Sequence, residues 1–547
     1  MLDWLDKLGA RPDHPMHSVA AAKQLLSGTS QDPLKALEEI ASWLGTVTAT
    51  GGYRPATRIA IVMLLDETGR SFEPQLVRQY LSPTTLREFE RLHVWQVALE
   101  YWERLADAYA LCRTEALHDR KTAQAFADEL PLLITRELRA LTDQTRLLHL
   151  RYLPVRAKIW ATLFEVYRLS ETMNCDIHRL QAYANDAQTS APRHEFLRAL
   201  MLDAASPESM LVPQVELAAR IAARFADSFL FKTAPEAACN WAVDLDHPHR
   251  PLHANANAVA GASTRFFGAG VVIAKMGQVI ERLTSNPAEK ERRFGDDYSV
   301  QDKIMVLKHL KRYWGAQPPH RREARRNVQI GMVAAHGFEN ALHLVPRVEF
   351  SGMAEVTRGM DVKLREKLGL GLAEAHEDVP TEKWTEQNAS TWGLGVKLPR
   401  QSEQWVRIGA LCALKSGAQP WRIGAVRRLY RDSADHEHAG VEVLSKKPLS
   451  VWLRGIGEGV TLAENWATSS GSFAFDYLNV ILLGESAASA QRNEMLLAHG
   501  QFHAGVLYEA MMGQTPPYLR LGELLEQGED FDRASFIWVE RAPSARK

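Results

Sequence analysis

The sequence Pro-Pro-His-Arg-Arg-Glu-Ala-Arg-Arg-Asn-Val at 318–328 decides how the chain is interpreted. It places four guanidinium groups within six residues, at Arg321, Arg322, Arg325 and Arg326. Alternating apolar residues follow at Val328, Ile330 and Met332. Because side chains alternate between the two faces of a strand, this spacing predicts that a strand begins here. The arginines therefore form a candidate anion site at the start of a strand.

A second motif, Asn-Ala-Ser-Thr-Trp-Gly at 388–393, adds complementary groups. Arginine donates two parallel hydrogen bonds to a phosphate or to the O6 and N7 edge of guanine. The Asn388 amide and the Ser390 hydroxyl can each donate and accept, and Gly393 has no Cβ to prevent close approach of a ligand. Together the two motifs predict a site for a guanine nucleotide.

The two motifs resemble the signature of the PilZ family, bacterial receptors for cyclic di-GMP. That signature is Arg-x-x-x-Arg followed by Asp/Asn-x-Ser-x-x-Gly on a small β-barrel. Segments similar to the family's later strands follow in order, at 394–398, 405–408, 421–428 and 439–444. The last of them contains Gly-Val-Glu-Val, where the family has Gly-Val-x-Phe. The resemblance covers residues 316–450 and implies that cyclic di-GMP is bound by Arg321, Arg322, Arg325, Arg326, Asn388, Ser390 and Gly393.

Two features depart from the family pattern. Arg326 and Asn388 are 62 positions apart, a longer separation than the family usually has, which predicts an insertion at about 338–386 with a helix over 354–372. Both Arg321/Arg325 and Arg322/Arg326 have the required spacing. The doubled arginine favours the second pair, whereas the alternation of the following strand favours the first. In the family, an arginine just before the spaced pair accompanies two stacked ligand molecules, a role that Arg321 has only in the second register.

Residues 1–235 are predicted to form a succession of helices. Apolar residues recur at intervals of three and four, and prolines stand where helices begin or end. The predicted helical segments include 19–26, 33–44, 56–65, 86–111, 123–141, 154–169 and 213–231. This pattern indicates a helical bundle or an irregular solenoid, which we expect to offer a surface to a protein partner.

The segment 236–315 is interpreted as a loop followed by helices that lead to the barrel. The run Asp-His-Pro-His-Arg-Pro-Leu-His at 246–253 holds metal-ligand residue types, but its prolines and the lack of paired spacing favour a solvated loop. Helices are predicted at 260–283 and 300–313. The basic residues and interleaved aromatics at 300–326 leave RNA binding as an alternative function. The other interpretation of this segment is that its lysines face water while an apolar stripe of the helix is buried.

Residues 451–547 are predicted to form a β-rich unit, with strands near 473–483, 493–497, 503–508 and 536–540 and a helix near 519–526. A second small barrel fits this pattern. The fold class expected for the whole chain is therefore α+β: a helical N-terminal region, a PilZ-like β-barrel and a β-rich C-terminal unit.

The amino-acid composition and net charge argue against several classes of function. The 547 residues are 46% hydrophobic and 24% charged with a net charge of −1, so the overall field does not draw the protein to DNA or to an anionic membrane. The four cysteines are far apart, which predicts buried free thiols in a reducing cytoplasm. The acidic N-terminus and the absence of a long apolar run predict a soluble cytoplasmic protein. No catalytic motif is recognisable, so we expect no enzyme activity, no metal and no cofactor.

The function expected from the resemblance is a cyclic di-GMP receptor that controls motility, pili or surface-associated behaviour through ligand-dependent protein contacts. A PilZ-fold scaffold that binds no nucleotide is the main alternative. Neither the protein partner nor the number of bound nucleotides follows from the sequence.

Overall fold

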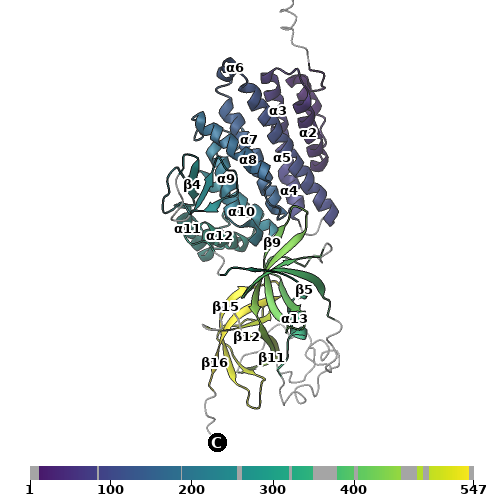
Figure 1. Ribbon diagram of the computed structural model, residues 1–547, viewed down its shortest axis with the longest axis vertical. Coiled ribbons are helices and arrows are strands. Elements are labelled where there is room, and N and C mark those ends of the chain that lie inside the picture. The colour runs from purple at the N-terminus through teal and green to yellow at the C-terminus, as the bar shows by residue number, and fades with distance from the viewer. Residues whose placement is uncertain are drawn as a thin grey trace, which may run out of the picture. The chain divides into compact units, whose positions relative to one another are not determined.

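A computed structural model describes residues 12–82, 86–186, 188–254, 261–319, 323–348, 379–399, 405–456, 477–484 and 492–540. The chain divides into two compact units, Met1–His320 and Arg321–Lys547. The first unit holds most of the described helices and a small sheet, and the second holds two six-stranded barrels and one short helix (Figure 1). The expected α+β fold class is confirmed. Within the described ranges, no helix is both long and apolar enough to cross a membrane.

The N-terminal unit begins with a helical region, as predicted. Prolines occupy the first positions of six of its helices, where a missing N–H costs no hydrogen bond. The helices are α1 (Val19–Leu26), α2 (Pro33–Ala49), α3 (Pro55–Gly69), α4 (Glu73–Leu81), α5 (Glu88–Ala116), α6 (Arg120–Ala125), α7 (Leu130–Leu150), α8 (Ala157–Thr172), α9 (Pro192–Ala204) and α10 (Val212–Phe225).

Helix α7 is enclosed by its neighbours and buries charged as well as apolar side chains. Its Arg139 pairs with Glu195 of α9 at 2.7 Å and with Asp186 at 2.9 Å. Burial alone would raise the pKa of Glu195, but Arg139 and Arg198 outweigh that effect and hold the pKa at about 2. The helical unit is therefore held together partly by ion pairs that depend on one another.

A small antiparallel sheet follows the helices, in the order β1-β4-β2-β3. Its strands are β1 (Leu230–Lys232), β2 (Trp241–Asp244), β3 (Leu252–His253) and β4 (Thr264–Gly268). The sequence had suggested an irregular loop at 236–258 and one helix at 260–283, so this sheet is a correction. The helix α11 (Val272–Ser285) begins only after β4, and α12 (Val300–Trp314) then agrees with the predicted helix at 300–313. Strands of two to five residues are too short to show a clear alternation.

The first barrel of the C-terminal unit is closed in the order β10-β7-β6-β5-β8-β9. Its strands are β5 (Arg326–His336), β6 (Glu382–Ser390), β7 (Gly393–Lys397), β8 (Leu411–Ser416), β9 (Arg422–Arg431) and β10 (Glu437–Ser445). Its interior is apolar and includes Met332, Trp384, Leu394, Val426 and Val441. The predicted insertion contributes α13 (Phe338–Leu344), and the helix predicted at 354–372 lies outside the described residues.

The second barrel has the order β11-β12-β13-β16-β15-β14. Its strands are β11 (Lys447–Ile456), β12 (Tyr477–Gly484), β13 (Asn493–Ala498), β14 (Leu507–Ala510), β15 (Tyr518–Gln527) and β16 (Phe531–Val539). The helix predicted near 519–526 is wrong, because this segment is β15. Its leucines and glutamates favour a helix in isolation, but Leu519 and Leu521 alternate into the barrel core and pairing with β16 overrides that preference.

Helix α13 joins the two barrels of this unit. Its Phe338, Ala341 and Leu344 share one apolar cluster with strand residues of both barrels, among them Ile423 and Ile481. Asp530 accepts a hydrogen bond from the Phe338 N–H at 2.6 Å, which ties the start of the helix to the second barrel. The insertion thus fixes the barrels to each other.

Candidate functional site

The second motif forms the hairpin between β6 and β7. Ser390 and Gly393 are partners across the two strands, so Thr391 and Trp392 make the two-residue turn. The Trp392 carbonyl accepts a hydrogen bond from the Val443 N–H at 3.0 Å, and the Lys446 ammonium lies 4.2 Å from the centre of the Trp392 ring. These contacts hold the turn against β10 and give the motif a fixed shape.

Arg325 brings the first motif to the second. Its Nη1 donates to Asn388 Oδ1 at 2.6 Å, although the whole predicted insertion lies between the two residues in sequence. A Cβ built on Gly393 would lie 3.1 Å from Ser390 Oγ and 3.4 Å from Arg325 Nη2. Gly393 is not among the described glycines with positive φ. This glycine is therefore needed for close approach rather than for an unusual backbone conformation.

Glu323 fixes the segment that carries Arg325. Its Oε2 accepts a hydrogen bond from the Thr391 N–H at 2.9 Å, and hydrogen bonding to Thr391 lowers the pKa of this carboxyl. The residues just before β5 are thus attached to the hairpin turn, which places the Arg325 guanidinium beside Asn388.

The other predicted residues have different positions. Arg326 is exposed and pairs in register with Ala389, while Ser390 Oγ lies 3.3 Å from the Gly393 carbonyl. Arg321 and Arg322 lie outside the described residues. The structure therefore brings together Arg325, Asn388, Ser390 and Gly393.

The sequence interpretation missed three residues beside this site: Gly395, Gly440 and Arg428. Gly395 is a register partner of both Asn388 and Gly440, and Gly440 is a partner of Arg428. Strand alternation from Gly393 could have placed Gly395 on the same face. The position of Arg428 depends on how β9 pairs with β10, which local sequence does not show.

The histidine-rich segment is part of the small sheet. His253 stacks on Trp241 with ring centres 3.9 Å apart, and His247 pairs with Asp244 at 2.9 Å. Across the described ranges, no group of three or more His, Cys, Asp or Glu residues is arranged to hold a metal ion. All four cysteines are buried and free, as predicted.

The basic helix α12 packs its apolar side against the core. Trp314 is buried, and its indole N–H donates to the Met201 carbonyl at 2.9 Å, so its ring does not offer a stacking face to a base. Lys303 was expected to face water but is buried, and its ammonium donates to the Lys290 carbonyl at 2.7 Å. These contacts agree with a buried apolar stripe and weaken the RNA-binding alternative.

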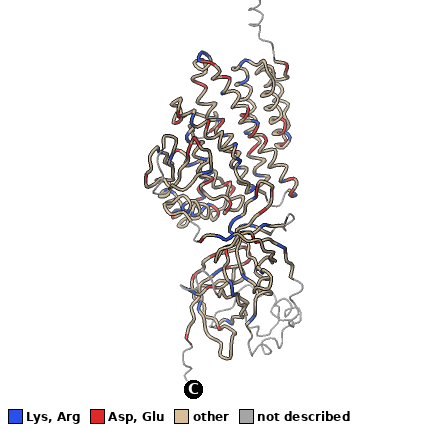
Figure 2. The backbone as a smooth tube through the Cα atoms, viewed as in Figure 1, with Lys and Arg blue, Asp and Glu red and all other residues tan. Residues whose placement is uncertain are grey.

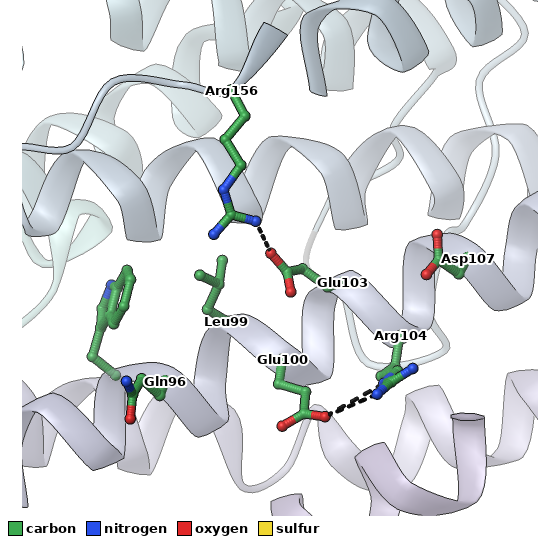
Figure 3. Close-up of a pocket in the computed structure, with 8 residues that line it drawn as sticks. Gln96, Leu99, Glu100, Glu103, Arg104, Asp107 and Arg156 are labelled. Atoms are coloured by element: carbon green, nitrogen blue, oxygen red, sulfur yellow. Dashed lines mark hydrogen bonds and ion pairs between the residues drawn. The ribbon is translucent and has the colours of Figure 1, made fainter. Parts of the chain in front are cut away.

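A cavity of about 440 Å³ lies on the surface of α5 (Figure 3). Arg104 pairs with Glu100 at 3.3 Å, and Arg156 pairs with Glu103, so both arginines of the cavity already have carboxylate partners within it. Figure 2 shows Lys and Arg interspersed with Asp and Glu in both units, in agreement with the net charge of −1. The cavity therefore resembles an ordinary mixed-charge surface more than an anion site.

The family comparison concerns the helical region. Residues 20–236 match the family model of the N-terminal domain of the cyclic-di-GMP receptor FimW. We call them the FimW-like region. The match begins within α1 and ends before β2, so it includes neither motif of the first barrel. None of the curated proteins matches the chain. The FimW-like region relates the chain to a cyclic-di-GMP receptor, whereas the PilZ resemblance depends on the barrel and its motifs.

Proposed function

We propose that this chain is a receptor for cyclic di-GMP and that the nucleotide binds on the outer face of the first barrel. The observation that carries the proposal is the meeting of Arg325 with Asn388 and Gly393, two residues of one motif that lies far from Arg325 in sequence. The FimW-like region gives independent support, because it lies in the other compact unit and contains none of these residues.

The chemistry of the three groups suits a guanine nucleotide. A guanidinium has five N–H donors in a planar fork, so contact with Asn388 is compatible with a bidentate contact to a phosphate or a guanine edge. Asn388 can also read a base edge, and the bare face of Gly393 leaves room for the ligand. We expect Arg321, Arg322 and Arg326 to add cationic groups. The position of Arg325 favours the Arg321/Arg325 register.

The proposed output is a change in protein contacts, with no catalytic step and no cofactor. We propose that the protein is cytoplasmic and controls motility, pili or surface-associated behaviour. We further propose that the FimW-like region carries the surface that binds a protein partner. A ligand can change partner binding only if the partner prefers one of two states of the receptor.

Calorimetry on the full chain tests the proposal. Cyclic di-GMP should bind, while GMP and ATP should bind far more weakly, since neither presents two guanines around a compact phosphate ring. Arg325→Ala should weaken cyclic di-GMP binding by about 10-fold or more, the usual loss for a charged bidentate contact. Arg520→Ala, which removes an exposed arginine from β15, is the matched control and should leave the Kd unchanged. A wild-type chain that does not bind cyclic di-GMP would instead be a nucleotide-free scaffold.

A further inference from the structure

One row of residues crosses the outer face of the first barrel. Asn388 of β6 is the register partner of Gly395 of β7, which pairs with Gly440 of β10, which pairs with Arg428 of β9. The residues on either side of the two glycines point into the barrel, since Leu394, Val396, Ala439 and Val441 belong to its apolar core. Gly395 and Gly440 therefore leave two adjacent positions of the outer face without side chains.

The polar side chains at both ends of the row lie over these glycines. A Cβ built on Gly395 would be 2.5 Å from Asn388 Oδ1, and a Cβ built on Gly440 would be 3.3 Å from the Cβ of Arg428. The Cγ and Cδ of Arg428 are 3.8 and 3.9 Å from that same point. The two glycines are one strand spacing apart, roughly 5 Å, and the backbones of Asn388 and Arg428 at the ends of the row are three spacings apart, roughly 14 Å.

A β-bulge places Arg428 on this face. The register of β9 with β10 shifts between Gly440 and Val441, which pair with Arg428 and Val426. Val426 and Leu429 both contact the barrel interior, so strict alternation over these residues is broken. The extra residue lets Arg427 and Arg428 both leave the interior. Bulges of this kind redirect side chains toward functional surfaces.

Arg428 differs from the other arginines of β9. Arg427 pairs with Glu442 at 2.8 Å and with Glu526 of the second barrel, and Arg431 pairs with Asp435 at 3.1 Å. Arg422 donates to Ser416 at 3.0 Å. Within the described part of the chain, Arg428 has no hydrogen-bond or ion-pair partner. Arg428, a half-buried residue across the two glycines from Asn388, is thus available to an anionic ligand.

We infer that Arg428 is a further ligand-binding residue, which contacts the end of the dinucleotide opposite Arg325. The inference rests on the proposed function. The Arg325 guanidinium lies beside Gly393 and the Arg428 stem beside Gly440, so the two arginines flank the bare glycines on which the ligand is placed. Either a phosphate or a guanine edge satisfies the planar fork of Arg428. A mononucleotide cannot use both ends of the row, so Arg428 should favour cyclic di-GMP over GMP.

Titration of the full chain with cyclic di-GMP and with GMP tests the inference. Arg428→Ala should weaken cyclic di-GMP binding about 10-fold or more and change GMP binding little. Arg428→Lys should be intermediate, since it keeps the charge but lacks the fork. Arg428→Gln keeps a long stem beside Gly440 but lacks the charge. If the alanine variant does not fold, the affinity of the glutamine variant for cyclic di-GMP tests the role of Arg428 in its place. Arg520→Ala is again the control.

The outcomes separate this inference from the proposed function. Failure of the wild-type chain to bind cyclic di-GMP overturns both. If the wild-type chain binds, Arg325→Ala weakens binding and both folded Arg428 variants keep the wild-type Kd, then only the role of Arg428 is rejected. Equal losses for cyclic di-GMP and GMP would reject its role in selecting the dinucleotide.

Discussion

At the scale of single residues, glycines shape the candidate site as much as arginines do. Arg325, Asn388 and Arg428 each lie over a glycine of the outer face, at Gly393, Gly395 and Gly440 respectively. A side chain at Gly393 or Gly395 would meet a polar group that the ligand is expected to use, and one at Gly440 would contact the aliphatic stem of Arg428. Arginines without such a bare surface would provide charge but no place for flat bases to lie.

Gly395→Ala should therefore impair binding although Gly395 lies outside both motifs. The added Cβ would lie within 2.8 Å of three Asn388 side-chain atoms, so Asn388 must move away from Arg325. We expect cyclic di-GMP affinity to fall about 10-fold, the cost of one lost polar contact to a charged group. Calorimetry on the purified full chain gives the Kd.

Gly331→Ala is a matched control for this variant. Gly331 also lies within a strand of the first barrel, but a Cβ there meets nothing within 4 Å. Its Kd should equal that of the unmodified chain. If both glycine variants bind equally well, Asn388 does not need its observed position to hold the nucleotide.

At the scale of elements, sequence patterns predicted what depends on local periodicity. The N-terminal helices and the strand that begins near 328 follow from the spacing of apolar residues, whereas the hairpin at 388–393 was not predicted. The segment of β15 was mistaken for a helix because only its pairing with β16 makes it a strand. The role of Arg428 was missed because it depends on a bulge and on pairing between strands distant from the motifs. Non-local pairing is thus the information that local sequence patterns lack.

Helix α7 gives an element-scale prediction about stability. Arg139→Ala would leave Glu195 and Asp186 without their shared partner, and the Glu195 side chain is only 1% exposed. Glu195 keeps Arg198 and Asp186 keeps Arg70, so the cost should exceed that of an exposed pair but stay below the roughly 3–5 kcal/mol of a buried charge left without any partner. Chemical denaturation followed by circular dichroism at the helix band should show this loss of unfolding free energy.

Arg104→Ala provides the comparison on a neighbouring helix. Arg104 pairs with Glu100 on the surface of α5, where both side chains are about half exposed. An exposed pair with this spacing contributes about 0.3–0.5 kcal/mol. Similar losses of unfolding free energy for Arg139→Ala and Arg104→Ala would show that burial does not strengthen the ion pairs of α7.

At the scale of the whole molecule, the candidate site lies close to the division of the chain. The two compact units meet in sequence at His320 and Arg321, and the arginine motif spans that boundary. The segment before it, Gly315–Pro319, links α12 to the motif. Ligand contacts made by these arginines would therefore restrain the connection between the first compact unit, which contains the FimW-like region, and the barrels.

Hydrogen exchange with and without cyclic di-GMP should detect this restraint. Ordering each residue costs about 1–2 kcal/mol, which charge-assisted hydrogen bonds from several arginines can offset. Protection of the backbone amides should rise at 388–395, across 315–328 and into the end of α12. The protection of the amides of β15 should stay the same. The Arg325→Ala variant at the same ligand concentration is the control and should show a much smaller rise. Protection limited to 388–395 in the unmodified chain would mean that the nucleotide binds without restraining the link between the two units, and the signal to a partner would then have to leave from the barrel itself.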